Sequence, residues 1–361
     1  MFFDSSVLSR LLGIGLAPAL IQPLALAMGH FDDAVPMRIA EVQREGLLLH
    51  DGERAHEARQ LPALRNALEV ESDALAVGDW VLAQRNAFSE WWVCERLAPL
   101  NQLARRLHDG RDKVTRVVIV SNVDTALVVM GLDHDFNLRR LERYVALVRM
   151  AGVAAVVVLT KRDLCADEAS RLAEVRAVLP ADVVAVAVNA LADEPRTALS
   201  PWLGEGQTLV LLGSSGAGKS TLTNALLGDA VQITGANREG DNRGRHTTTV
   251  RSLHTMPGGA CVIDTPGLRT LRLDGEAQDL AAAFGDIAAL ASQCRFRDCH
   301  HADEPGCAVR EGVGAERLRN FHKLQREAQR DTMTALERKA QVQVWKARGR
   351  AARVRMNAKR G

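Results

Sequence analysis

The chain has 361 residues, of which 47% are apolar and 4% aromatic, and its formal net charge at pH 7 is +2. This length excludes a single small domain and predicts two or three folded units, while the apolar content suffices for sizeable cores. The near-neutral total conceals an uneven distribution, because nine Lys and Arg residues and no acidic residue follow Glu337.

Residues 1–35 contain a largely apolar run, Leu11–Met28, that superficially resembles a secretory signal peptide. Asp4 and Arg10 precede the run without a basic cluster, and two prolines interrupt it. The run is also barely long enough to span a bilayer. We therefore predict a packed helical arm, with neither export nor a membrane span.

Residues 36–104 alternate between short apolar runs and turn sequences such as Asp51-Gly52 and Gly78-Asp79. The expected strands are Met37–Val42, Gly46–Leu49, Ala67–Val70, Trp80–Ala83 and Trp91–Leu97. Closely spaced strands of this kind predict a small β-barrel of the OB type. Such barrels bind RNA through one face, and a purely structural barrel is an equal alternative at this point.

Residues 105–275 are expected to form a nucleotide-binding unit. It begins with a basic linker containing Arg105, Arg106, Arg111, Lys113 and Arg116, and its first strand is predicted at Val117–Asn122.

A further strand, Val156–Leu159, precedes the tetrapeptide Thr160-Lys161-Arg162-Asp163. The Asp163 carboxylate can accept hydrogen bonds from the N1–H and the exocyclic amine of guanine, whereas adenine offers no such edge. Thr160 stands where Asn is usual in this motif. The next predicted strand, Val183–Val188, ends at Asn189-Ala190, where such proteins often carry Ser-Ala, and the backbone there is expected to contact the guanine O6 atom.

A phosphate loop follows at Gly213–Ser220, which satisfies the pattern G-x-x-x-x-G-K-[ST]. A buried strand is predicted before it at Gln207–Leu212, and a helix after it at Ser220–Leu227. Lys219 is expected to reach the β- and γ-phosphates and the Ser220 hydroxyl to bind Mg²⁺. Backbone groups around the phosphates come from Gly213, Ser214, Ser215, Gly216, Ala217, Gly218 and Thr221.

The third nucleotide motif is Asp264-Thr265-Pro266-Gly267, at the end of a predicted strand, Ala260–Asp264. Asp264 is expected to hold the Mg²⁺ shell and the Gly267 N–H to meet the γ-phosphate.

Between the last two motifs lies Asn237–Thr249, a polar stretch with glycines that is expected to be a mobile loop. Thr248 in this loop is expected to complete the Mg²⁺ shell. Leu268 occupies the place where many GTPases keep a glutamine that orients water. His246 is the nearest side chain able to replace that glutamine, and a hinge or RNA-contacting role for it is equally open.

Residues 276–361 contain Cys294, Cys299, His301 and Cys307, four soft ligands whose spacing suits a closed tetrahedral Zn²⁺ site. His300 is an adjacent alternative for the histidine ligand. A disulfide with a spare thiol, or unpaired surface thiols, are the other interpretations, and the cytosolic setting expected of a nucleotide enzyme argues against disulfides. The basic tail after Glu337 is expected to bind polyanions, with a merely solvated end as the alternative.

The order of the motifs is unusual, because the base-reading motif precedes the phosphate loop. This order predicts an α/β fold with a circularly permuted P-loop GTPase domain, flanked by an N-terminal OB-type β-barrel and a C-terminal helical zinc-binding domain. The layout resembles the small-ribosomal-subunit-dependent GTPase A (RsgA) family. The shared segments are Val77–Val81, Ser121–Asp124, Asp135–Leu141 with Arg143-Tyr144, Gly244–Thr249 and the cysteine–histidine spacing.

The resemblance implies a GTPase that hydrolyses GTP to GDP and phosphate, slowly alone and faster on the small ribosomal subunit. It further implies binding to the rRNA of that subunit during late maturation, Mg²⁺ with GTP, and one structural zinc ion. We expect a cytoplasmic monomer that does not associate with membranes. Two other functions remain open at this point: an ATP-dependent RNA-binding enzyme, and a zinc-containing RNA-binding module whose nucleotide pocket is vestigial.

Overall fold

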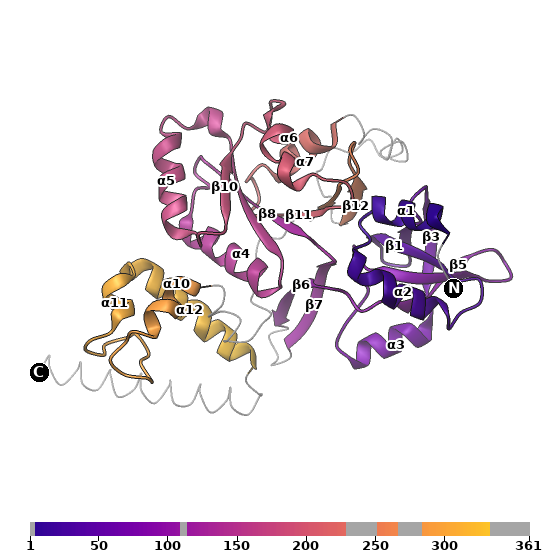
Figure 1. Cartoon of the computed structure of the whole chain (residues 1–361), viewed down its shortest axis with the longest axis horizontal. Helices are drawn as coiled ribbons and strands as arrows, with labels where there is room; N and C mark the ends of the chain where they lie inside the picture. Colours follow the sequence, from indigo (N-terminus) through magenta and orange to yellow (C-terminus); the bar gives the residue numbers. More distant parts are fainter. Residues whose placement is uncertain (1–3, 109–113, 229–250, 266–283, 333–361) are drawn as a thin grey trace, which may run out of the picture.

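A computed structural model describes residues 4–108, 114–228, 251–265 and 284–332 (Figure 1). The N-terminal arm consists of α1 (Ser5–Gly13), the short 3₁₀ helix η1 (Pro18–Leu20) and α2 (Ile21–Met28). Asp4 caps α1 by accepting a hydrogen bond from the Ser6 N–H at 3.1 Å. Leu11 and Leu24 are fully buried in a cluster with Trp80 of the barrel, so the arm packs onto that domain. Within the described residues, no helix has the length and apolar character needed to cross a bilayer.

Five strands close a barrel next to the arm: β1 (Val35–Val42), β2 (Leu47–His50), β3 (Ala55–Gln60), β4 (Trp80–Arg85) and β5 (Trp91–Arg96). They pair in the order β1-β2-β3-β5-β4, and β4 returns to β1. The predicted N-terminal barrel is therefore confirmed.

The strand expected at Ala67–Val70 is wrong, because these residues end helix α3 (Pro62–Val70). Pro62 opens this helix in its first turn, where its missing N–H costs nothing. Leu68 is buried while Val70 is exposed, which is the one-sided burial of a surface helix.

The barrel is followed by a two-stranded antiparallel sheet formed by β6 (Gln102–His108) and β7 (Val114–Ser121). Arg105 and Arg116, which were expected in a basic linker, thus lie on paired strands. The strand predicted at Val117–Asn122 is present as β7, but it pairs with β6 and does not join the nucleotide-binding sheet. The expected domain boundary between residues 104 and 105 falls inside β6.

The nucleotide-binding sheet has the strand order β10-β9-β8-β11-β13-β12. Its strands are β8 (Thr125–Gly131), β9 (Ala154–Thr160), β10 (Val184–Ala187), β11 (Thr208–Leu212), β12 (Ser252–Thr255) and β13 (Cys261–Asp264). All neighbouring pairs are parallel except β12 with β13. β12 also touches the barrel through the register pair Glu41–Ser252, where the Ser252 hydroxyl donates to Glu41 at 2.6 Å.

Helices cover both faces of this sheet (Figure 1). On one face, α4 (Leu138–Met150) and α5 (Glu168–Val178) pack in a buried cluster with every second residue of β8 and β9. On the other face, α7 (Lys219–Leu227) packs in a second cluster with the intervening residues of the same strands. Successive side chains of a strand point to opposite faces of the sheet, so both sets are buried when helices cover both faces. Short helices complete the domain: η2 (Arg162–Leu164), α6 (Glu194–Ala198) and η3 (Ser200–Trp202).

The described C-terminal part consists of α10 (Gly285–Ala291), α11 (Ala308–Gly312) and α12 (Ala315–Thr332). Figure 1 shows these helices beside α4, and Phe321 and Leu324 of α12 are buried in the same cluster as Tyr144 of α4. The C-terminal helices therefore pack directly on the nucleotide-binding domain.

Arg38 on β1 joins the arm, the barrel and the nucleotide-binding sheet. Its side chain is fully buried and lies against the Trp80 ring, with 5.6 Å between the guanidinium carbon and the ring centroid. The guanidinium donates to the carbonyl of Ile14, to the Thr208 hydroxyl at 2.9 Å and to the carbonyl of Asn122 at 3.0 Å. One side chain thus connects four segments that lie far apart in the sequence.

We predict that Arg38→Lys destabilises the protein by about 2–4 kcal/mol, because a single ammonium nitrogen cannot reach buried acceptors that the guanidinium contacts with two different nitrogens, and each unsatisfied acceptor costs about 1–3 kcal/mol. Urea unfolding followed by tryptophan fluorescence measures the loss. Arg65→Lys on the exposed face of α3 is the matched control and should leave the midpoint unchanged. Equal unfolding midpoints for both variants would show that the packing of the arm, the barrel and the nucleotide-binding sheet does not depend on Arg38.

Candidate nucleotide site and metal cluster

The three nucleotide motifs meet at one edge of the sheet because their strands are parallel. Thr160-Lys161-Arg162-Asp163 follows β9, the phosphate loop follows β11, and Asp264 ends β13. Ligands of open parallel sheets bind outside the carboxyl ends of the strands. Strand pairing therefore brings together segments that the chain order separates.

The phosphate loop has the backbone that its glycines permit. Gly213, Gly216 and Gly218 have φ values of 153°, 84° and 90°. A Cβ atom at Gly213 would lie 2.2 Å from the Val129 carbonyl oxygen. The last two residues of the loop, Lys219 and Ser220, are the first two of α7, so that the positive end of this helix faces the loop.

Lys219 lies across the phosphate loop. Its ammonium donates to the carbonyl oxygens of Gly213 at 2.9 Å and Ser214 at 2.7 Å. Burial lowers the pKa of this ammonium, while the carboxylates of Asp264 and Asp135 act in the opposite direction. The cation is thus held at the loop, close to where backbone N–H groups can surround phosphate oxygens.

Thr160 ties the base-reading motif to the phosphate loop. Its side chain is fully buried, and its hydroxyl donates to the carbonyl oxygen of Ala217 at 2.5 Å. Thr160 was expected to take part in nucleotide binding although it stands where Asn is usual, and the structure gives it a definite partner in the phosphate loop.

Lys161 and Arg162 are held by ion pairs, whereas Asp163 is exposed to solvent. Lys161 adopts the left-handed conformation, with φ of 59°, and its ammonium contacts Asp133 at 2.8 Å. Arg162 pairs with Glu194 at 2.9 Å and with Glu168 at 3.3 Å. The Asp163 carboxylate is exposed and has no hydrogen-bond or ion-pair partner among the described residues, so both of its oxygens can accept hydrogen bonds.

Asn189 and Ala190 follow β10 at the same edge of the sheet. The Asn189 N–H donates to the Glu194 carboxylate, and its side-chain oxygen accepts from the Leu191 N–H at 3.0 Å. Ala190 is buried. Glu194 therefore fixes both Arg162 and Asn189, a role that the sequence did not reveal.

Asp135 is a second residue that the sequence did not assign to this site. Its carboxylate accepts from the Ser214 hydroxyl at 2.6 Å and from the Gly131 N–H at 3.2 Å, and it also pairs with Arg140. It thereby orients one residue of the phosphate loop. Its position after β8 was the available signal, but β8 itself was not predicted.

Asp264 lies half-buried at the end of β13, where burial raises the pKa of its carboxyl against the effects of His254 and Lys219. Thr265 next to it donates its hydroxyl to the Leu211 carbonyl at 2.5 Å, which holds the motif against β11.

Ser215, Ser220 and Thr221 are exposed at the loop and the first turn of α7. The remaining predicted site residues lie outside the described residues: His246, Thr248, Gly267 and Leu268, together with the rest of the expected loop Asn237–Thr249.

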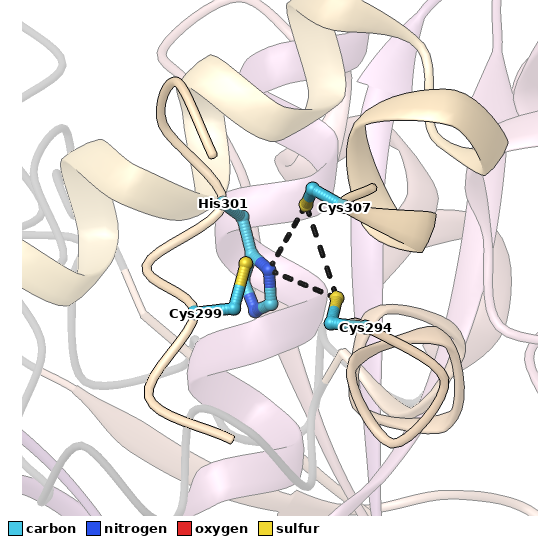
Figure 2. A group of neighbouring side chains, drawn as sticks. All are labelled: Cys294, Cys299, His301 and Cys307. Atoms are coloured by element: carbon cyan, nitrogen blue, oxygen red, sulfur yellow. Dashed lines mark hydrogen bonds between the residues drawn. The ribbon is translucent and has the colours of Figure 1, made fainter. Parts of the chain in front are cut away.

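The C-terminal cysteines and one histidine form a compact cluster (Figure 2). The ligand atoms of Cys294, Cys299, His301 and Cys307 all lie within 4.8 Å of one another. The Cys294 and Cys307 sulfurs are 3.9 Å apart, and the His301 Nδ1 atom is 3.6 Å and 3.4 Å from them. His301 rather than His300 supplies the nitrogen, and no disulfide joins the described cysteines.

These distances fit a tetrahedral metal ion. With metal–sulfur bonds of about 2.3 Å and metal–nitrogen bonds of about 2.0 Å, a tetrahedron places its sulfurs about 3.8 Å apart and sulfur and nitrogen about 3.5 Å apart. Cys307 precedes α11, and its sulfur accepts from the Arg310 N–H at 3.5 Å. The cluster can therefore hold a metal ion between α10, the loop before α11 and α11 itself.

The fold and the site together define a P-loop GTPase whose chain is circularly permuted. Counted from β11, the strands run β11, β12, β13, β8, β9, β10, with the phosphate loop first and the base-reading motif near the end. The chain resembles two solved structures in fold. These are YjeQ from Thermotoga maritima (TM-score 0.60, 23% identity, 82% of this chain and 98% of that one) and YloQ, described as a circularly permuted GTPase (TM-score 0.56, 23% identity, 84% and 98%).

Sequence comparison identifies the family. A profile of the RsgA GTPase family matches residues 100–274. Curated relatives named small ribosomal subunit biogenesis GTPase RsgA are 46% identical over 298 residues. The protein from Xylella fastidiosa strain M23 aligns with 81% of this chain and 87% of its own length, and that from Xanthomonas campestris pv. campestris strain B100 with 81% and 80%. The chain belongs to the RsgA GTPase family, and it is a GTP hydrolase.

We predict that the purified protein carries one metal ion per chain, and that Cys294→Ala and Cys307→Ala each lose it, because three ligands cannot close the tetrahedron. Elemental analysis of protein purified without chelators measures the content. His300→Ala is the matched control and should keep the ion. Protein without metal, or metal retained in both cysteine variants, would contradict this assignment.

Proposed function

We propose that this chain hydrolyses GTP while bound to the small ribosomal subunit, that the subunit stimulates the reaction, and that the cycle serves late maturation of that subunit. The observation that carries the proposal is the convergence of the phosphate loop, the base-reading motif and Asp264 at one edge of a permuted sheet. The relatives at 46% identity are named for small-subunit biogenesis, which supports the choice of partner.

The nucleotide occupies the edge formed by β9, β10, β11 and β13 in this proposal. Asp163, whose oxygens lack partners among the described residues, reads the guanine edge, and the backbone at Asn189 and Ala190 lies against its O6 atom. Thr160, Lys161 and Arg162 fix this region. The phosphates lie in the loop from Gly213 to Thr221, where Lys219 exchanges its loop carbonyls for β- and γ-phosphate oxygens.

Magnesium accompanies GTP in this family, and the donor set at the loop suits it. The exposed Ser220 hydroxyl and the Asp264 carboxylate are hard oxygen ligands of the kind that Mg²⁺ prefers. Thr248 is proposed as a further ligand when GTP is bound, and Gly267 as a donor to the γ-phosphate. When bound, the ion neutralises charge on the β- and γ-phosphates.

Hydrolysis breaks the bond between the γ-phosphorus and the oxygen that bridges it to the β-phosphorus while a water oxygen bonds to the γ-phosphorus; GDP leaves with the bridging oxygen, and the proton of the water passes to phosphate or solvent. Lys219 stabilises the charge that develops on the phosphates. Leu268 has no atom that can orient the water. We therefore assign this task to His246, positioned when the protein docks on the subunit.

The metal in the C-terminal cluster is proposed to be one structural zinc ion. Three thiolates and one imidazole form a soft donor set that fills all four positions of a tetrahedron, which leaves none for catalysis. When bound, the ion would link the segment that follows α10 to Cys307 at the start of α11. The OB-type barrel and the basic tail after Glu337 are proposed to add rRNA contacts, and we propose a cytoplasmic monomer.

We expect Asp163→Asn to lower GTP affinity sharply and to favour xanthine nucleotides, because an amide cannot accept from both guanine donors but can donate to the extra oxygen of xanthine. Equilibrium binding of GDP, XDP and ADP measures the change. Asp167→Asn, nearby on the cap of α5, is the control and should bind GDP as the wild type does. Unchanged GDP affinity in Asp163→Asn would show that the base is read elsewhere.

Basal hydrolysis is expected to be slow, and Lys219→Ala should abolish it through the lost contacts to phosphate. His246→Ala should keep the basal rate and lose most of the stimulation by purified small subunits. Phosphate release with and without subunits, with GTP and with ATP, tests the proposed function as a whole. If subunits do not accelerate the wild type, the proposed partner is wrong; if basal and stimulated rates fall together in His246→Ala, that residue is structural.

A further inference from the structure

A basic groove lies between α4 of the nucleotide-binding domain and α12 of the C-terminal domain, with a volume of about 520 Å³. Six cationic side chains line it: Arg139, Arg140, Arg143, Arg319, Lys323 and Arg326. The acidic residue in the lining is Glu316, and the other described lining residues are two asparagines and His322. Among the described residues, none of the nucleotide motifs or of the metal cluster lines this groove.

The α12 wall carries a regular stripe of positive charge. Arg319, Lys323 and Arg326 are spaced by four and three residues, which places them on one face of the helix, and all three are exposed. The stripe extends along about 10 Å of the helix axis at 1.5 Å per residue. Arg319 and Lys323 have no acidic partner among the described residues.

The α4 wall carries arginines that are already paired. Arg139 pairs with Glu316, and Arg140 pairs with Asp135. Arg143 meets Glu327 through two bonds, of 3.1 Å and 2.6 Å. These pairs fix the wall and neutralise three of the six cations, so that the excess charge lies on the α12 stripe.

The composition of the lining selects the kind of ligand. Small-molecule pockets are mostly apolar with a few polar groups, whereas the described lining of this groove is wholly polar or charged. A row of flexible cations without apolar surface suits the phosphates of a nucleic-acid backbone, which such side chains bind without reading sequence. A 10 Å stripe matches a run of roughly two or three phosphates along one strand.

We propose that this groove binds a run of rRNA backbone phosphates, so that the RNA contacts the nucleotide-binding and C-terminal domains at once. The proposal rests on the proposed function, which supplies the RNA. It assigns the contact to α4 and α12 and is independent of the barrel and of the basic tail.

The test uses the double variant Arg319→Glu/Lys323→Glu in the full chain. Its binding to purified small subunits should be at least about tenfold weaker near 0.1 M salt, and its log affinity should fall less steeply with log salt, by about two in slope, since each lost phosphate contact removes about one. The control Arg171→Glu/Arg176→Glu makes the same change in charge at two exposed positions of α5, outside the barrel and the groove, and should match the wild type. GTP affinity and basal hydrolysis should be the same in all three proteins.

The milder variant Arg319→Gln/Lys323→Gln guards against misfolding and should show a smaller loss in the same direction. Protein-free small-subunit rRNA provides the second arm and should show the same loss of affinity and slope. Equal binding by the groove and control variants would overturn the proposal, as would weaker subunit binding with an unchanged salt slope, which would indicate a protein partner. If subunits do not stimulate hydrolysis by the wild-type protein, the proposed function is wrong. The binding measurements with free rRNA would still show whether the groove binds RNA phosphates.

Discussion

The structure depends on the parallel pairing of β11 with β8 on one side and β13 on the other. Val210 at the centre of β11 is in register with Ala126 and with Ile263, and all three are buried. A parallel sheet delivers the carboxyl ends of its strands to one edge whatever the order in which the chain enters them. The phosphate loop therefore meets the base-reading motif although that motif comes earlier in the chain, and the hydroxyl of Thr160 on the Ala217 carbonyl is the direct contact between them.

Permutation changes what is attached to the site. On one side, Arg38 binds the barrel to Thr208 at the start of β11, the strand that ends at the phosphate loop. On the other side, Arg317 of α12 bonds to Glu142 of α4, to Asp286 of α10 and to the carbonyl of Val178. Burial raises the pKa of Glu142, so this carboxylate needs the cation beside it.

Two side-chain contacts connect the basic groove to the phosphate loop. Arg140 lines the groove and pairs with Asp135, and Asp135 accepts a hydrogen bond from Ser214 in the phosphate loop. An RNA phosphate that binds Arg140 would compete with Asp135 for this cation, and Asp135 is the acceptor that orients the Ser214 hydroxyl. This geometry gives a physical connection between an RNA contact and the nucleotide, through two side chains.

The sequence predicted the parts of the fold whose signal is local. Apolar strands before Thr160, Gly213 and Asp264, the barrel and the family all follow from short patterns and their order. The strand at Ala67–Val70 was wrong because a short apolar run does not distinguish helix from strand, and β3 was missed because it buries only Ala58.

The side-chain contacts that join distant segments could not be predicted from the sequence for a different reason. Glu194, Asp135 and Arg38 act on segments brought near them only by sheet pairing, and no linear pattern records those contacts. The cysteine–histidine cluster was accessible because its ligands lie within one short stretch of chain.

A crystal structure with a non-hydrolysable GTP analogue and Mg²⁺ tests the central claim most directly, that segments permuted in the chain build one nucleotide site. We predict guanine against Asp163 and Asn189, phosphates in the loop from Gly213 to Ser220, and the Lys219 ammonium moved from the carbonyls of Gly213 and Ser214 to phosphate oxygens. A nucleotide bound away from this edge of the sheet, or a guanine that Asp163 does not contact, would contradict the account.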